Sequence, residues 1–103
     1  MEEKIPLETY SMNIIANSGD GRSYAFQALE KAKTDSFLEA SELLKKSDDS
    51  INLAHKWQTD LLVLEAQGNH QEINILLIHS QDHLMTSILA NELIKEIIKL
   101  YKR

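Results

Sequence analysis

A chain of 103 residues is long enough for one domain and too short for two, so we expect a single domain over residues 1–103. The net charge of −5 and the lack of a dense Lys/Arg cluster argue against nucleic-acid binding, and no apolar run is long enough to cross a membrane. The absence of cysteine excludes disulfides and thiolate metal sites and, with an acidic N-terminus unlike a signal peptide, predicts a cytoplasmic protein.

The first predicted helix runs from about residue 7 to residue 33. The sequence favours helix throughout, because it has one proline, three glycines and no alternating strand pattern. The segment NSGDGRS, residues 17–23, interrupts the pattern. It is either a phosphate-cradling loop or a helical stretch whose glycines let a neighbour pack closely. We favour the helix, because the segment lacks the glycine spacing and the Lys-Ser/Thr of a phosphate loop. The expected buried face is Met12, Ile15, Gly19, Arg22, Phe26 and Leu29.

The second helix is predicted over about residues 36–66. Ser36 followed by Glu39 is typical of a capping box, and Gly68 suits a left-handed position after the helix ends. Positions three and four residues apart form its expected buried face. They are Phe37, Ala40, Leu44, Ser47, Ile51, Ala54, Gln58 and Leu61.

The third helix is predicted over about residues 70–101, with Asn69 as its N-cap and Glu72 completing a capping pattern. Short turns between long helices predict antiparallel neighbours. From residue 73 to residue 91 the only fixed charge is Asp82, and the apolar side chains form two seams. One seam is Ile73, Leu77, Leu84, Ile94 and Ile98, and the other is Ile75, Ile78, Met85 and Leu89.

A helix that is apolar nearly all round must be covered on every side, and the other two helices of its own chain cannot cover all of it. The cover is either an unrelated partner or another copy of the chain, and symmetric self-association is the commoner solution. We therefore predict a homo-oligomer in which the third helix is central.

The segment LLIHSQDHLMTSIL, residues 76–89, combines this apolar helix with a cluster of polar groups. His79 and His83 are four residues apart and share a face, which Thr86 continues. Asp82 belongs to the second apolar seam, where a carboxylate needs a partner from another helix, another chain or an ion. The histidines are compatible with a structural role, with a zinc-binding pair, or with a nucleophile that accepts a labile group such as phosphoryl.

The same segment resembles the signature of the lactose/cellobiose-type enzyme IIA of the bacterial phosphotransferase system. That signature reads approximately L-L-x-H-[AG]-Q-D-H-L-M-T. Residues 13–33 resemble the first helix of the family, residues 36–62 the second, and KEIIKLYKR its ending. Ser80 stands where the family usually has Ala or Gly. Gly21 stands where Ala is more usual, which we expect to loosen the first helix slightly.

The resemblance implies an all-α fold, an antiparallel three-helix bundle that assembles into a homotrimer. It implies that His79 accepts a phosphoryl group from the histidine-containing phosphocarrier protein and passes it to a cysteine of enzyme IIB. Enzyme IIB then serves the uptake of cellobiose, lactose or a related disaccharide. The resemblance also implies that three copies of Asp82 hold a divalent cation, Mg²⁺, at the three-fold axis.

The other polar residues have less defined roles. His83 either orients His79 or hydrogen-bonds the phosphoryl group, and a purely structural role is equally open. Gln81 and Thr86 are candidates for further polar contacts, whereas we expect His55 to be a core or rim histidine. The alternative to the whole interpretation is a non-catalytic helical interaction module with a structural metal site.

Overall fold

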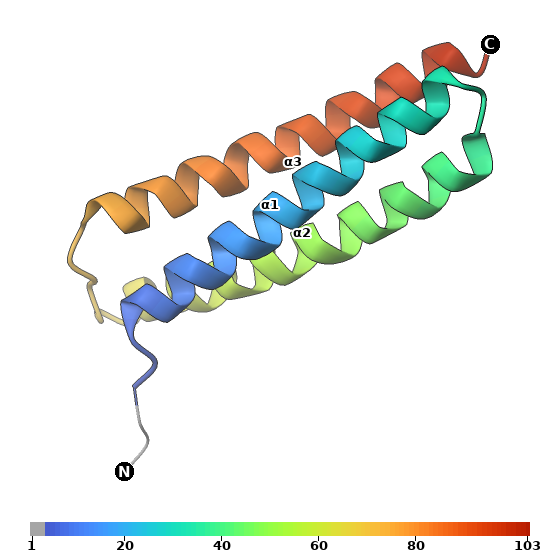
Figure 1. Ribbon diagram of the computed structural model, residues 1–103. Helices are drawn as coiled ribbons and strands as arrows, with labels where there is room; N and C mark the ends of the chain where they lie inside the picture. Colours follow the sequence, from blue (N-terminus) through green and yellow to red (C-terminus); the bar gives the residue numbers. More distant parts are fainter. Residues whose placement is uncertain (1–3) are drawn as a thin grey trace.

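The computed structural model of the chain describes residues 4–103, and it forms three long helices joined by two short connections (Figure 1). Helix α1 spans Leu7–Lys33, α2 spans Phe37–Ala66 and α3 spans Ile75–Tyr101. Successive helices are antiparallel and build a rod of 55 × 24 × 19 Å. The described residues contain no strand, so the predicted all-α three-helix fold is confirmed. Residues 1–3 of the acidic N-terminal segment lie outside the described part.

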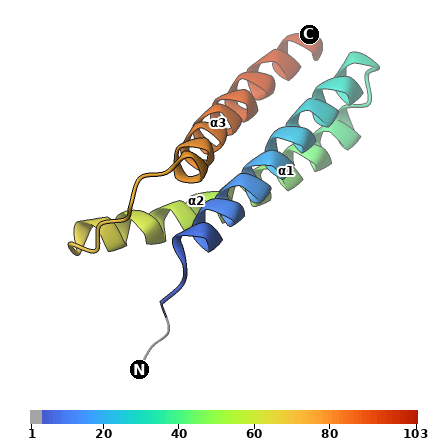
Figure 2. The same ribbon diagram turned by 60° about the vertical axis from the view of Figure 1, so that its left-hand side comes forward.

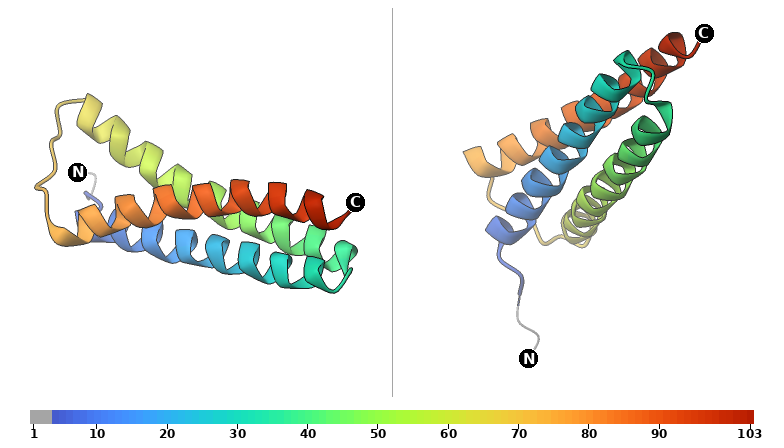
Figure 3. Two further views of the ribbon diagram at one scale, coloured as in Figure 1. Left: turned by 90° about the horizontal axis from the view of Figure 1, so that it is seen from above. Right: turned by 45° about the vertical axis from the view of Figure 1, so that its right-hand side comes forward.

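Helix α1 packs along both other helices, whereas α2 and α3 contact each other much less. Figures 2 and 3 show α2 diverging from α3 towards the connection between them. The chain therefore covers α3 mainly from the α1 side, and the rest of the α3 surface is left open.

The buried face of α1 differs from the predicted one. Met12 and Phe26 were expected inside, but they are 48% and 47% exposed. Small residues occupy the core instead, because they let two helices approach α1 closely. The segment NSGDGRS is part of one continuous helix, so the phosphate-loop interpretation is wrong. The buried residues of α1 are Tyr10, Ser11, Ile14, Ser18, Gly21, Ala25, Ala28 and Ala32.

Helix α2 follows its prediction, with Ala40, Ser47, Ala54 and Leu61 buried. Ser36 is at the N-cap as expected, but its side chain makes no capping hydrogen bond. Glu39 instead forms an ion pair of 3.0 Å with Lys31 across the turn from α1, so the expected capping box is absent. Gly68 has a φ of +87°, which confirms the predicted left-handed position after the helix.

Helix α3 begins at Ile75, later than the predicted start near residue 70. Its N-cap is Asn74 rather than Asn69, and the Asn74 side chain accepts a hydrogen bond of 2.8 Å from the Leu77 amide. Because α2 and α3 diverge, non-helical chain spans the gap between them, and α3 starts only at the second available asparagine.

The core consists of two apolar clusters at opposite ends of the bundle. The cluster near the α1–α2 turn contains Ala25, Ala28, Ala32, Ala40, Ile94 and Ile98. The cluster at the other end contains Tyr10, Ile14, Ala54, Leu61 and Leu84. Along each helix, polar and small residues separate the two clusters.

This middle layer is a hydrogen-bonded network that joins all three helices. Ser47 of α2 donates to the Gly21 carbonyl of α1 at 2.6 Å, and Asn91 of α3 donates to the Ser47 hydroxyl at 2.8 Å. Asp48 accepts from Asn91 at 3.1 Å and pairs with Lys95 at 2.7 Å. Because the buried Ser47 and Asn91 are satisfied only in one alignment, the network favours a single register of the helices.

Gly21 is a position where we expect alanine to destabilise the protein. A Cβ there would lie 2.5 Å from Ile51 Cγ1 and 3.2 Å from the Ser47 carbonyl oxygen. Such overpacking costs about 1–3 kcal/mol, which exceeds the gain of about 1 kcal/mol from replacing glycine in a helix. Gly21→Ala should therefore lower the free energy of unfolding in urea. Adding Ile51→Ala should make Gly21→Ala less harmful than it is alone, and purely additive effects of the two substitutions would contradict this explanation.

Candidate functional site

One long face of α3 is apolar and exposed. The predicted seam of Ile75, Ile78, Met85 and Leu89 lies on it, and Ile75 and Met85 are 85% and 65% exposed. Leu93, Ile97 and Leu100 continue the same face. The other predicted seam is buried at Leu84, Ile94 and Ile98, whereas Ile73 is exposed and precedes the helix.

Asp82 is exposed within the apolar face. It follows Ile78 by four residues and precedes Met85 by three, so all three side chains are on one side of the helix. None of the ion pairs among residues 4–103 includes Asp82. A carboxylate with apolar neighbours and no ion-pair partner among the described residues is available to a cation supplied from outside.

His79 and His83 form a neighbouring pair at the edge of this face, and His79 is three residues before Asp82. Their ring centroids are 5.6 Å apart and the ring planes meet at 67°, an edge-to-face arrangement. His79 is exposed and His83 is half-buried. No hydrogen bond to the His79 ring occurs within the described part of the chain. An imidazole that is exposed and free of hydrogen bonds can present a nitrogen lone pair to an incoming electrophile.

His83 is held by two neighbours that the sequence interpretation missed. Its Nδ1 lies 3.3 Å from the hydroxyl of Ser87, a fully buried residue one turn further along α3. Its Cε1 and Nε2 atoms lie over Gly19 of α1, each 3.7 Å from where a Cβ would be. The i, i+4 spacing of His83 and Ser87 was a sequence signal for their contact. No local sequence pattern indicates that His83 lies beside Gly19.

Gln81 and Thr86, the other candidate polar contacts, are engaged elsewhere. Gln81 exchanges two hydrogen bonds with Gln58 of α2, at 2.6 and 2.7 Å. This reciprocal amide pair joins α2 to α3. Thr86 donates back to the Asp82 carbonyl at 2.8 Å, as threonine in a helix often does. Neither side chain contacts the imidazole of His79.

The remaining histidines lie outside this pair. His55 is exposed on α2 with Thr59 as its neighbour at 3.4 Å, and His70 contacts Glu65 at 2.7 Å. No group of three or more metal-ligating side chains occurs within residues 4–103. A zinc site formed by the histidines of one chain is therefore not supported, and any ion at Asp82 needs ligands from elsewhere.

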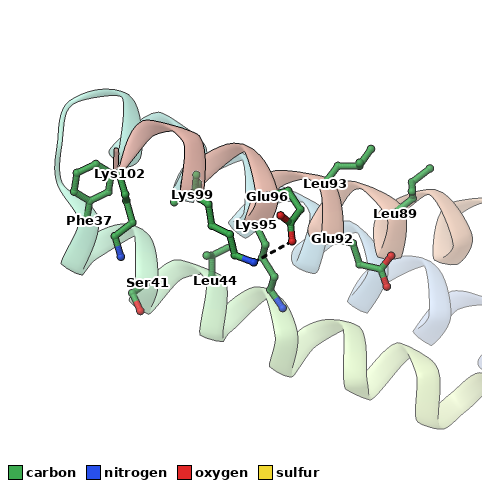
Figure 4. Close-up of a pocket in the computed structure, with 11 residues that line it drawn as sticks. Phe37, Ser41, Leu44, Leu89, Glu92, Leu93, Lys95, Glu96, Lys99 and Lys102 are labelled. Carbon is green, nitrogen blue, oxygen red and sulfur yellow. Dashed lines mark hydrogen bonds and ion pairs between the residues drawn. The ribbon is translucent and has the colours of Figure 1, made fainter.

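A groove of about 690 Å³ lies between α2 and the C-terminal half of α3 (Figure 4). Three lysines line it, but each already has a partner. Lys95 pairs with Asp48, Lys99 pairs with Glu96, and the Lys102 ammonium lies 5.7 Å from the Phe37 ring. The groove begins at Leu89, about 15 Å along the helix from His79. It is not part of the His79 site.

Comparison with known proteins decides the family. The family model for "PTS system, Lactose/Cellobiose specific IIA subunit" matches residues 9–102, nearly the whole described chain. The chain belongs to this family. The lactose-specific EIIA component of Streptococcus mutans is 49% identical over 90 residues, which are 87% of this chain and 86% of the relative. The chain is therefore a IIA component of a sugar phosphotransferase system, and it acts in phosphoryl transfer.

Solved structures of IIA components share the fold. The cellobiose-specific enzyme IIA of Bacillus anthracis matches with a TM-score of 0.91 and 44% identity, covering 96% of this chain and 92% of that one. A IIA component from the Escherichia coli N,N'-diacetylchitobiose branch, solved in complex with HPr, matches with a TM-score of 0.82 and 40% identity, covering 96% of each chain. No helix in residues 4–103 of this IIA chain has the length and apolarity needed to span a bilayer.

Proposed function

We propose that this IIA component carries a phosphoryl group on His79, taking it from HPr, the histidine-containing phosphocarrier protein, and passing it to enzyme IIB. The observation that carries the proposal is the His79 ring, exposed on α3 and free of hydrogen bonds within the described chain. The relative solved with HPr supports the choice of donor. The proposed pathway ends in the uptake of cellobiose, lactose or a related disaccharide.

The chemistry needs only a nucleophilic imidazole that two partners can reach. A His79 nitrogen lone pair forms a bond to phosphorus while the N–P bond of the donor phosphohistidine breaks, and its electron pair returns to the donor ring. In the second step a cysteine thiolate of enzyme IIB attacks phosphorus, and the His79 nitrogen is the leaving group. Residues 75–94 of α3 contain no Lys or Arg, which suits a phosphoryl group that must leave His79 readily. The edge-to-face arrangement of His83 and His79 supports a contact between His83 and the transferred group.

We further propose that the IIA chain works as a homotrimer with α3 at the centre. The exposed apolar face of α3 supports this assembly, because monomers rarely leave so long an apolar surface in water. In such a trimer three copies of Asp82 converge. Their carboxylate oxygens fit a hard divalent cation such as Mg²⁺, whereas one chain alone offers a single ligand.

The alternative function is a helical interaction module in which the metal is purely structural. It would bind a metal such as zinc but would carry no phosphoryl group on His79. The two functions therefore differ in covalent chemistry rather than in fold.

Incubation with phosphoenolpyruvate, enzyme I and HPr tests the proposed function. We expect one phosphoryl group per chain, stable in base and lost in acid, as a phosphoramidate is. A mixture without HPr is the control and should leave the chain unlabelled. A folded chain that takes no label from phosphorylated HPr would contradict the proposed function and favour the structural-metal module.

A further inference from the structure

The two ring nitrogens of His83 have different surroundings. Nδ1 faces the hydroxyl of Ser87 at 3.3 Å, inside the bundle. The Cε1–Nε2 edge faces Gly19, where α1 has no side chain to cover it. His79 lies beside the ring. Because Nδ1 is engaged by Ser87, Nε2 is the ring nitrogen left to meet a group carried by His79.

The direction of the Ser87 hydrogen bond decides which nitrogen of neutral His83 carries the proton. Ser87 is fully buried, and His83 Nδ1 is the acceptor that the described residues offer to its hydroxyl. If Nδ1 carried the proton, the Ser87 hydroxyl hydrogen would have no acceptor, as with the buried hydroxyls of Ser11 and Ser18, whereas donation to Nδ1 satisfies it. Donation from the hydroxyl to Nδ1 is the direction that satisfies both groups, and it leaves the proton of the neutral ring on Nε2.

We propose that Ser87 and Gly19 position His83 as an Nε2–H donor to the phosphoryl group on His79, and thereby make His79 the sole acceptor of the pair. A protonated Nε2 has no lone pair with which to attack phosphorus, so His83 does not compete with its neighbour. The same N–H donates to a phosphoryl oxygen once the group is on His79. Ser87 acts through His83 and is a positioning residue. This assignment rests on the proposed phosphoryl function of His79.

Nitrogen-resolved NMR of the histidine rings tests the positioning without any phosphoryl transfer. At mildly alkaline pH, wild-type His83 should be in the Nε2–H form, with the Nδ1 resonance shifted by an accepted hydrogen bond. An Overhauser contact should join the His83 Hε1 proton to Gly19. Ser87→Ala should lose the hydrogen-bond shift and weaken this contact, and Ser87→Thr, which keeps the hydroxyl, should retain both.

Ser18→Ala is the matched control, because Ser18 is an equally buried serine whose hydroxyl has no hydrogen-bond partner. It should leave the His83 resonances unchanged. A wild-type His83 protonated on Nδ1 would overturn the proposal. An unchanged Nδ1 resonance in Ser87→Ala would overturn it equally, whether or not His79 accepts phosphoryl.

Labelling rates link the geometry to the reaction. Ser87→Ala should slow transfer from HPr to His79 by on the order of threefold to tenfold, the effect of about one hydrogen bond, whereas Ser18→Ala should transfer at the wild-type rate. An equal rate in both variants would overturn the role of Ser87. A wild-type chain that accepts no label would overturn the proposed function instead. The NMR result on the His83 tautomer does not depend on that outcome.

Gly19 offers a second, steric test of the same site. Gly19→Ala should be tolerated, because its Cβ would make ordinary contacts of 3.7 Å with His83. Gly19→Leu keeps a good helix former but fills the space beside Nε2, so it should move the ring and slow transfer more than Gly19→Ala does. Equal rates for the two variants, with the His83 resonances unmoved in both, would overturn the role of Gly19.

Discussion

Replacing His79 with alanine should abolish phosphoryl labelling by HPr while leaving the helical fold intact. The loss should be complete, because His83, the only other imidazole described on α3, is predicted to be protonated on Nε2. The fold should survive, because the His79 ring is exposed and makes no hydrogen bond within the described chain. Labelling with radioactive phosphoenolpyruvate, together with circular dichroism and thermal unfolding, measures both effects.

His55→Ala is the matched control for this substitution. His55 is also an exposed helical histidine, but it lies on α2 and contacts only Thr59 among the described side chains. It should take label at the wild-type level. If His79→Ala were labelled normally and His55→Ala were not, the acceptor would be on α2 and the assignment to α3 would be wrong.

The bounds of α1 and α2 and the positions of residues around each helix could be predicted from local sequence patterns. The ranges of α1 and α2 follow from helix propensity and from the position of Gly68, and the structure reproduces them. The placement of Asp82 in one seam with Ile78 and Met85 follows from helical geometry alone. These features need no knowledge of how the helices pack.

The core residues of α1, the start of α3 and the contact of His83 with Gly19 depend on how the helices pack, so local sequence patterns did not predict them. Hydrophobicity favours Met12 and Phe26 as core residues of α1, but the close approach of two helices selects Ser11, Ser18 and Ala25 instead. The start of α3 depends on the divergence of α2 and α3, because both Asn69 and Asn74 are good capping residues. The contact of Gly19 with His83 joins residues far apart in sequence, so no local pattern reveals it.

If the proposed homotrimer holds a divalent cation, removing that cation should weaken the assembly, because the three Asp82 carboxylates would then repel one another. Two unit charges about 4 Å apart repel by about 4 kcal/mol at an effective dielectric constant near 20. Three such pairs would repel by about 12 kcal/mol, which is comparable with the whole stability of a small domain. Sedimentation of the wild-type protein with and without chelator at neutral pH should show loss of trimer in the chelator sample.

Asp82→Leu should have the opposite effect on the metal dependence. Leucine removes the charge and extends the apolar face formed by Ile78 and Met85, so the variant should form a trimer that binds no divalent cation and ignores chelator. Asp60→Leu, which removes an exposed carboxylate of α2, is the control and should keep the chelator sensitivity of the wild type. Elemental analysis of each purified protein reports the bound metal directly.

Comparing the wild type with Asp82→Leu and Asp60→Leu shows whether the trimer needs the metal bound at Asp82. The chelator effect depends on buried like charges, so it must vanish when the charges vanish, while the apolar face alone still drives association. A wild-type trimer that contains no metal and withstands chelator at neutral pH would rule out the cation. A variant Asp82→Leu that remains monomeric would show that the aspartates themselves, and not the surrounding apolar face of α3, hold the three chains together.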